Sequence, residues 1–153
     1  MLGDNDAMAT IAVKNLNAAR KFYEGKLGFK VVHTEGDQAV AYKSGSSQVL
    51  VYQSQFAETN KATAATWMVG DVEGLVKDLK AKGVTFEHYD FPGMTRKGDV
   101  HVAGRRKNAW FKDPDGNTLA LAQGWFLLRD PVLDQREGAI LARRCAARSP
   151  QTP

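Results

Sequence analysis

The sequence has few of the residues that form disulfides and no segment typical of a membrane helix. Cys145 is the only cysteine among 153 residues, so no internal disulfide can form, which excludes the disulfide scaffolds and fits a reducing compartment. No apolar run approaches the roughly 18 residues of a membrane helix, and the stretch MLGDNDAM at the start has neither a basic region nor an apolar signal core. We therefore expect a cytoplasmic protein with no membrane partner.

Extremes of composition are also missing. Hydrophobic residues make up 43% of the chain and charged residues 25%, which excludes collagen-like and disordered classes. The length suits one domain, and a core of that size folds without a metal or a disulfide. A bound metal would therefore serve function and not folding.

The net charge of +4 is concentrated in one place. Residues 94–107, MTRKGDVHVAGRRK, contain five Lys or Arg and one Asp, which accounts for the whole excess of 21 basic over 17 acidic residues. A basic loop of this kind attracts an anionic ligand or is simply solvated. We expect no nucleic-acid partner, and salt-sensitive binding to unrelated DNA would overturn that expectation.

The first third of the chain predicts the order β-α-β-β-β. Period-2 alternation predicts a strand over 8–14, and helical spacing of apolar residues predicts an amphipathic helix directly after it. Asn15 or Asn17 can cap the start of this helix, and Gly28 can supply its left-handed end. Three more strands, separated by turn residues, follow at 29–35, 38–44 and 47–53.

The same order then repeats. Val13-Lys14-Asn15-Leu16 matches Val69-Gly70-Asp71-Val72 at an offset of 56 residues (13 to 69), and Gly83 ends the second helix as Gly28 ends the first. The predicted strands of this unit are 64–69, 84–89, 108–113 and 118–123, the last two joined by the turn Asp113-Pro114-Asp115-Gly116-Asn117.

The second unit contains a long insertion at 91–106, where the first unit has a tight turn. We expect a brief extended segment at 100–102 within it. Loops of this length in compact domains are commonly lids or binding loops.

Together these motifs resemble the vicinal oxygen chelate superfamily, which includes glyoxalase, bleomycin-resistance proteins, fosfomycin-modifying enzymes and extradiol dioxygenases. The residues that carry the resemblance are Val13-Lys14-Asn15-Leu16, the helix around Phe22-Tyr23 with the Leu27-Gly28-Phe29 that follows it, and the turn 113–117. The resemblance covers residues 8–123. It implies a small-molecule ligand and a homodimer whose clefts are built by both chains.

The fold implied by the resemblance is α+β. Two βαβββ modules, 8–54 and 63–123, form an open cupped mixed sheet with helices on the outer face and the ligand inside. Residues 1–7 are then an N-terminal extension and 124–153 a C-terminal tail. Asp130-Pro131 predicts the start of a helix in that tail, with its far end disordered.

Enzymes of this superfamily hold a divalent metal through four side chains, one each on the first and last strands of the two modules. The resemblance places these positions at Met8, Leu50, Ala64 and Ala120. None offers the imidazole or carboxylate donors that such metals take, and shifting the placement by one residue introduces no ligand. We therefore expect no metal or other cofactor.

A cup without a metal still has the composition of a small-molecule site, because it is apolar with a few hydroxyl groups and aromatic rings. Strand alternation predicts the residues that line it: Met8, Thr10, Leu50, Tyr52, Ala64, Thr66 and Ala120. Trp110 is either an aromatic wall of this cup or an ordinary core residue. His101, with Asp99 two residues away, is either a general base or a structural histidine.

These features favour a metal-independent protein that sequesters or senses an apolar or aromatic compound, including an anionic one. The alternative is an enzyme of the same superfamily, a lyase, an isomerase or a dioxygenase-like enzyme. It would use non-standard residues such as His101 and Tyr52, or a metal carried by its ligand.

Overall fold

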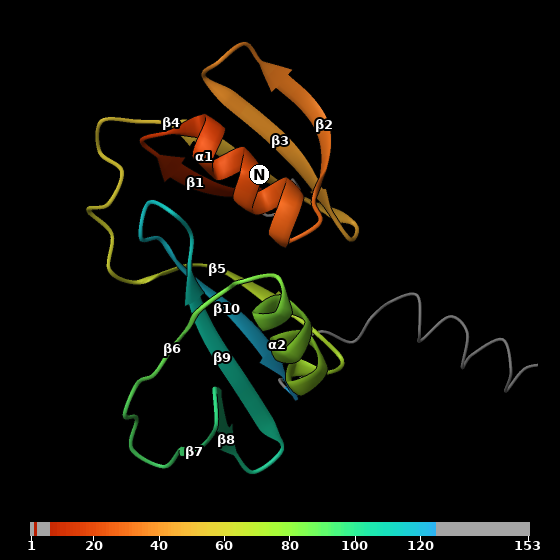
Figure 1. Cartoon of the computed structure of the whole chain (residues 1–153), viewed down its shortest axis with the longest axis vertical. Helices are drawn as coiled ribbons and strands as arrows, with labels where there is room; N and C mark the ends of the chain where they lie inside the picture. The colour runs from red at the N-terminus through yellow and green to blue at the C-terminus, as the bar shows by residue number, and fades with distance from the viewer. Residues whose placement is uncertain (1, 3–6, 125–153) are drawn as a thin grey trace, which may run out of the picture.

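The structure, a computed structural model, describes residue 2 and residues 7–124, which form two modules stacked along the long axis of the molecule (Figure 1). The first module contains β1 (Ala9–Val13), α1 (Leu16–Arg20), η2 (Lys21–Lys26), β2 (Lys30–Glu35), β3 (Ala39–Ser44) and β4 (Ser47–Gln53). The second contains β5 (Thr63–Met68), α2 (Val72–Ala81), β6 (Phe86–Glu87), β7 (Thr95–Lys97), β8 (Val100–Ala103), β9 (Arg106–Lys112) and β10 (Thr118–Gln123). The helix expected in the C-terminal tail lies outside the described residues.

Each module is a mixed sheet whose first strand pairs in parallel with its last. The strand orders are β1-β4-β3-β2 in the first sheet and β5-β10-β9-β8-β7 in the second, where β6 also pairs with β9. The predicted α+β class and the repeated β-α-β-β-β order are confirmed. The modules meet along their first strands, because the edge strands β1 and β5 lie close together.

The insertion in the second module is more regular than the sequence predicts. The strand expected over 84–89 is reduced to β6, which covers only the far end of β9 through the pairs Phe86–Phe111 and Glu87–Trp110. The hairpin β7–β8 covers the near end of β9, where His101 pairs with Asn108. The long strand β9 therefore pairs with β6 along one part of its length and with β8 along another. This pairing explains why residues of the expected loop form strands.

Both helices begin and end as the repeat predicts. The side chains of Asn15 and Asp71 accept hydrogen bonds from the backbone N–H groups of Ala18 and Gly74, each at 3.0 Å. Gly28 and Gly83 then adopt φ values of 73° and 76°, a left-handed conformation that favours glycine. Neither helix of the described part is long and apolar enough to cross a membrane.

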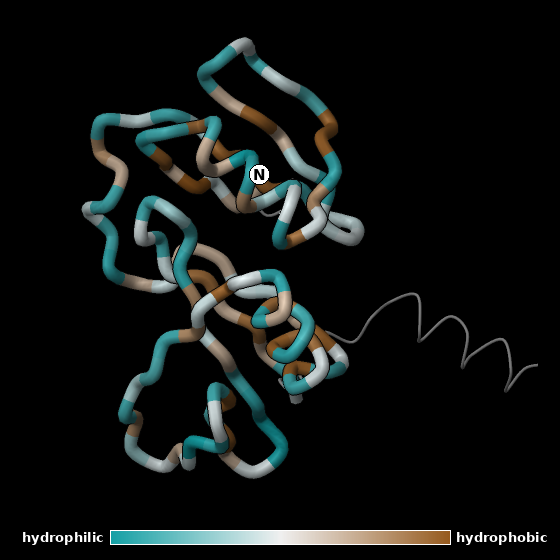
Figure 2. The backbone as a smooth tube through the Cα atoms, viewed as in Figure 1, coloured by the Kyte–Doolittle hydropathy of each residue, from teal (hydrophilic) through white to brown (hydrophobic). Residues whose placement is uncertain are grey.

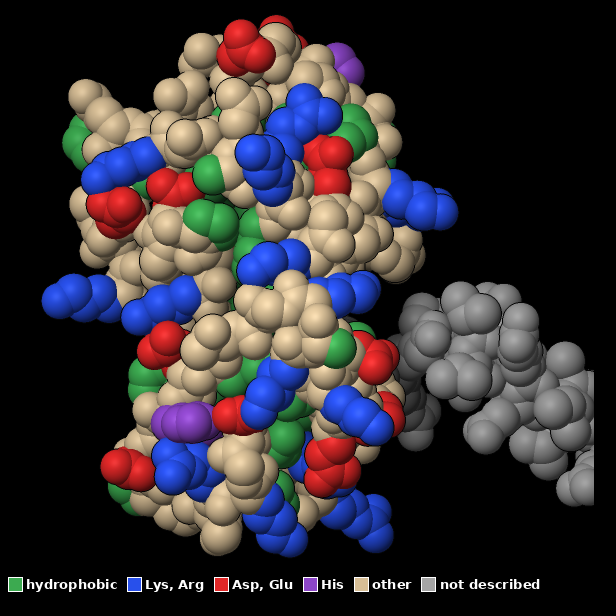
Figure 3. Space-filling view, viewed as in Figure 1, with side chains coloured by type: hydrophobic (Ala, Val, Ile, Leu, Met, Phe, Trp, Pro, Cys, Tyr) green, Lys and Arg blue, Asp and Glu red, His purple; other side chains and the backbone are tan. Residues whose placement is uncertain are grey.

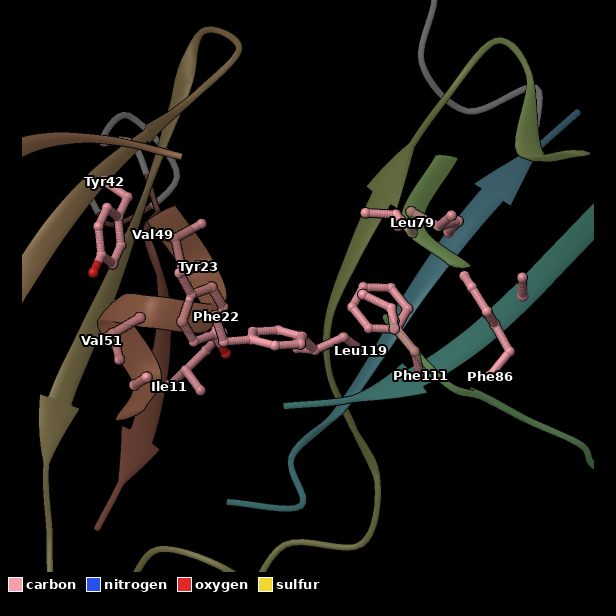
Figure 4. Packing of buried hydrophobic residues seen from close by; sticks show 14 of the residues in the cluster. Ile11, Phe22, Tyr23, Tyr42, Val49, Val51, Leu79, Phe86, Phe111 and Leu119 are labelled. Atoms are coloured by element: carbon pink, nitrogen blue, oxygen red, sulfur yellow. The ribbon is translucent and has the colours of Figure 1, made fainter. Parts of the chain in front are cut away.

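The helix-facing sides of the two sheets share a single core. Core residues of both modules lie between the sheets in Figure 4, with Phe22 of η2 reaching toward the second module. The rings of Phe22 and Phe111 are 6.3 Å apart, and those of Phe29 and Trp67 are 5.7 Å apart. Hydrophobic segments follow the strands and the inner helix faces, whereas the long connections are mostly hydrophilic (Figure 2).

The turn 113–117 acts as a polar clamp between the modules. Backbone N–H of Lys14 donates to Asp115 Oδ1 at 2.9 Å, and Asn117 Nδ2 donates to the carbonyl oxygen of Ala12 at 2.8 Å. The hydroxyl of Tyr23 donates to Asp113 Oδ2 at 2.9 Å. The turn therefore fixes the start of β10 against the end of β1, the two strands that carry several of the predicted site residues.

Candidate functional site

We call the side of each sheet that faces away from the helices its open face. In the first module, Thr10 lies opposite Leu50, and Leu50 lies opposite Ala41 on the next strand. Tyr52 is in the following row, half-buried, opposite Ala39. The neighbouring residues along these strands are buried in the core, so the alternation places the predicted residues of this module on its open face.

The open face of the second module carries the matching row. Thr66 lies opposite Ala120, and Ala120 lies opposite Trp110. Ala64 falls where the pairing of β5 with β10 shifts register, so it is an extra residue with no direct partner. Met8 precedes β1 and is 44% exposed.

The predicted site residues therefore form two groups on separate sheets. Because the helix-facing sides of both sheets belong to one core, the two open faces lie outside that core. The structure brings Thr66, Ala120 and Trp110 together and, separately, Thr10 and Leu50. The repeat predicts the two modules, but strand alternation identifies only which side of a strand a residue lies on and not how the two sheets are oriented, so all these residues were assigned to one cup.

Four aromatic residues gather on the open face of the second module and form what we call the aromatic cluster: Tyr89, Phe91, His101 and Trp110. Trp110 is central, with its ring 5.6 Å from Tyr89, 5.3 Å from Phe91 and 5.0 Å from His101. Phe91 is 45% exposed, whereas His101 is 1% exposed. The segment after β6 thus places two rings beside Trp110. Sequence reasoning missed this arrangement, because it placed Tyr89 at the end of the strand expected over 84–89 and Phe91 in the long insertion.

His101 is held in one tautomer by the backbone. The N–H of Tyr89 donates to His101 Nε2 at 3.1 Å, so the proton of a neutral ring must sit on Nδ1. Nδ1 is buried and has no hydrogen-bond partner in the described part of the chain. With Nε2 engaged as an acceptor, His101 presents a buried N–H donor, whereas a general base would need a free lone pair.

Asp99 does not orient His101. Its two carboxylate oxygens contact Lys80 Nζ at 2.5 Å and His88 Nε2 at 2.7 Å. The hydrogen bonds from Lys80 and His88 hold the pKa of Asp99 below its usual range. Asp99 lies in the turn between β7 and β8, outside the extended segment, which is why it points to a different histidine than the sequence spacing suggested.

The residues at the four positions that family enzymes use for a divalent metal do not fit one. Leu50, Ala64 and Ala120 carry no donor atom, and the thioether of Met8 suits soft Cu(I) better than Mg, Mn, Zn or Fe(II). Within residues 7–124, no group of three or more His, Cys, Asp or Glu side chains is arranged to hold a metal ion. We therefore propose no reaction that uses a metal held by these residues.

A separate hollow lies where the turn between β3 and β4 approaches β5. It has a volume of about 510 Å³ and is lined by residues 44–49 and 65–69 together with Ala7 and Ala9. Trp67 Nε1 donates to Ser44 Oγ at 2.9 Å beside it. Of the predicted residues only Thr66 borders this hollow, and the serine-rich turn was the one feature of the sequence that could have pointed to it.

The basic stretch 94–107 is part of the sheet and not a free loop. Arg96 and Lys97 lie on β7, and Lys107 on β9 forms an ion pair with Glu73 of α2 at 2.7 Å. On the face shown in Figure 3, basic side chains are spread over both modules with acidic ones among them. Arg96 is exposed and pairs across the strands with His101, which puts one positive charge on the same open face as the aromatic cluster.

Comparison with known proteins places this fold. A family model described as the Glyoxalase/Bleomycin resistance protein/Dioxygenase superfamily matches residues 7–121. Among solved structures, a lactoylglutathione lyase from Agrobacterium tumefaciens is similar with a TM-score of 0.59 and 18% identity, over 78% of this chain and 93% of that one. The comparison with curated proteins finds no significant match.

Two resistance proteins are similar to the same extent. A bleomycin resistance determinant encoded on the transposon Tn5 gives a TM-score of 0.60 at 18% identity, over 78% of this chain and 98% of that one. The fosfomycin resistance protein FosX from Listeria monocytogenes gives 0.61 at 15% identity, over 80% and 94%. At these identities the likeness extends to the fold alone.

Proposed function

Because the chain belongs to the Glyoxalase/Bleomycin resistance protein/Dioxygenase superfamily, we propose that it binds a small aromatic molecule on the open face of its second module without a bound metal. The observation that carries this proposal is the aromatic cluster around Trp110. A cytoplasmic location, expected from the single cysteine, belongs to the same proposal.

The geometry of the aromatic cluster supports a flat ligand. Trp110 meets Tyr89 at an interplanar angle of 87°, so the two rings form adjacent walls at a right angle. Each well-placed ring contact contributes about 0.5–1.5 kcal/mol beyond the apolar area it buries.

The polar groups around the aromatic cluster favour a ligand with an anionic or hydrogen-bond-accepting group. Arg96 provides a positive charge on this face, whereas Lys112, two residues beyond Trp110 on the same strand, forms an ion pair with Glu87 at 3.6 Å. The buried Nδ1–H of His101 lacks an acceptor within the described residues, and an unsatisfied donor of this kind costs about 1–3 kcal/mol. An acceptor on the ligand that reaches His101 would remove that cost.

The proposal includes a homodimer. Since the two open faces of one chain lie outside its shared core, neither face closes over the other, and a second copy can supply the opposite wall of each cleft. Light scattering on the eluting protein tests this part, with a mass of twice 16.8 kDa expected.

Enzymatic activity is the alternative, because one structural neighbour is a lyase. It would have to rely on groups other than His101 Nε2, which already accepts the Tyr89 N–H. Turnover of a ligand bound at the aromatic cluster would favour this alternative over simple binding.

Binding of naphthoate, a flat aromatic anion, tests the proposal. Calorimetry with the full chain should detect binding that Trp110→Ala weakens about tenfold, because the stacking energy of the indole ring is removed. Phe56→Ala, which removes a ring that is 69% exposed and outside the aromatic cluster, is the matched control and should bind normally. Equal affinity of both variants would place binding elsewhere, and uncharged naphthalene measures the share of affinity that the charge supplies.

A further inference from the structure

Residues 88–94, which we call the flap, connect β6 to β7 without pairing with any strand of the described sheets. The flap carries Tyr89 and Phe91, the two rings that contact Trp110 on the open face. None of its residues belongs to the buried core of the described chain, and Phe91 is nearly half exposed. Segments with so little buried apolar surface are the ones that open locally in native proteins.

Two histidines hold the start of the flap. The backbone N–H of Tyr89 donates to His101 Nε2 at 3.1 Å. One residue earlier, His88 Nε2 lies 2.7 Å from Asp99 Oδ1. Both partners belong to the β7–β8 hairpin, since His101 lies on β8 and Asp99 in the turn before it. Because His101 is buried on a paired strand, it offers the Tyr89 N–H a fixed acceptor.

The far end of the flap is a tight turn. Pro92 and Gly93 occupy its central positions, and Gly93 has a φ of 79°, a left-handed value that favours glycine. The N–H of Met94 donates to the carbonyl oxygen of Phe91 at 3.2 Å, which closes the turn. This hydrogen bond joins two residues of the flap, so the turn stays intact when the flap moves.

We propose that the flap is a movable wall of the aromatic site, which swings away from Trp110 to admit a ligand and is held closed by His101 and Asp99. This inference rests on the proposed function, because it concerns access to the same site. Ala120, opposite Trp110, is buried although it lies on the open face, so this part of the face is covered while the flap is closed. Through Nε2, His101 is a positioning residue, because it holds the backbone that carries the Tyr89 ring.

Hydrogen exchange of the Tyr89 amide in the full-length protein, measured by NMR, tests this proposal. His101→Leu removes the acceptor of this N–H, whereas His101→Gln keeps an amide oxygen at a similar distance from the backbone. We expect Tyr89 exchange to be about tenfold faster in His101→Leu, because one hydrogen bond of the closed flap is lost, and close to the wild-type rate in His101→Gln. His33→Leu, at an exposed histidine of β2, is the matched control and should leave this exchange unchanged.

A ligand provides the second measurement. With naphthoate at ten times its Kd, Tyr89 exchange in the wild type should slow about tenfold, because the ligand stabilises the closed flap that it binds. If calorimetry shows that naphthoate binds but Tyr89 exchange is unchanged, the proposed function stands and the movable wall is wrong. If naphthoate does not bind, the proposed function fails, and the ligand-free variants alone decide whether His101 holds the flap.

Two results without ligand overturn the proposal. Unchanged Tyr89 exchange in His101→Leu means that the flap is not held by this histidine. Equally fast exchange in His101→Leu and His101→Gln means that any substitution at this buried position loosens the segment, which contradicts a positioning role. Asp99→Ala removes the second contact from a turn and serves if His101→Leu does not fold: it too should speed Tyr89 exchange, and an unchanged rate contradicts the proposal.

Discussion

Removal of the Asp113 carboxylate is the perturbation that most directly tests how the two modules are joined. Asp113 is 5% exposed and accepts four hydrogen bonds. Backbone N–H groups of Asp115 and Asn117 bind Oδ1, while the Tyr23 hydroxyl and Asn117 Nδ2 bind Oδ2. Of these four, the Tyr23 bond crosses to the other module.

The expected cost of Asp113→Ala follows from this geometry. At about 1 kcal/mol net for each hydrogen bond, four bonds give about 4 kcal/mol, from which release of a buried carboxylate subtracts part. We expect a loss of about 3 kcal/mol in the free energy of unfolding, measured by urea denaturation with tryptophan fluorescence. Asp37→Ala, at an exposed turn, is the control and should stay within about 0.5 kcal/mol.

A double-mutant cycle isolates the contact between modules. Tyr23→Phe removes only the hydroxyl, and its coupling to Asp113→Asn should be at least about 1 kcal/mol, because the bond is buried and the acceptor is ionised. A coupling near zero, or a loss below about 1 kcal/mol for Asp113→Ala, would refute the role of the turn 113–117 as a clamp.

Three further predictions concern pH, the exit of the chain and the binding face. Burial raises the pKa of Asp113, so the folded state holds the proton of this carboxyl group more tightly than the unfolded state does. Relative to Asp113→Asn, the wild type should therefore lose stability as the pH rises from about 4 through the raised pKa. A difference in unfolding free energy between the two proteins that stays constant with pH in urea titrations would contradict this. Gly124→Ala should lower the unfolding free energy by about 1–3 kcal/mol because its Cβ meets the Arg105 carbonyl, and an unchanged thermal midpoint would exclude that contact. Tyr52→Ala should weaken naphthoate binding only if the first module of a partner copy closes the cleft over Trp110, so normal binding with an intact dimer would separate the two open faces.

Much of the fold could be predicted because its determinants are local. The N-cap residues Asn15 and Asp71 and the left-handed glycines Gly28 and Gly83 mark the same positions in both modules, and each depends only on adjacent backbone. Strand alternation likewise placed Thr10, Leu50, Thr66 and Ala120 on open faces.

The remainder depends on contacts between residues far apart in the sequence. His101 was paired with Asp99 on spacing alone, but the turn between β7 and β8 directs Asp99 to Lys80 and His88. The ring contacts of Tyr89 and Phe91 with Trp110 depend on the path of the chain after β6. No periodic pattern in the sequence predicts that path. The turn 113–117 contributed to the family resemblance in the sequence. Only the structure shows that its side chains form hydrogen bonds with the first module.

Metal analysis combined with ligand binding tests the central claim most directly. The full-length protein is purified from cells grown with Ni, Zn, Mn and Fe(II), its metal content is measured by mass spectrometry, and naphthoate affinity is determined before and after treatment with a chelator. The account predicts substoichiometric metal and an affinity that the chelator leaves unchanged. One metal ion per chain, with binding that is lost on chelation and restored by adding the ion back, would contradict it.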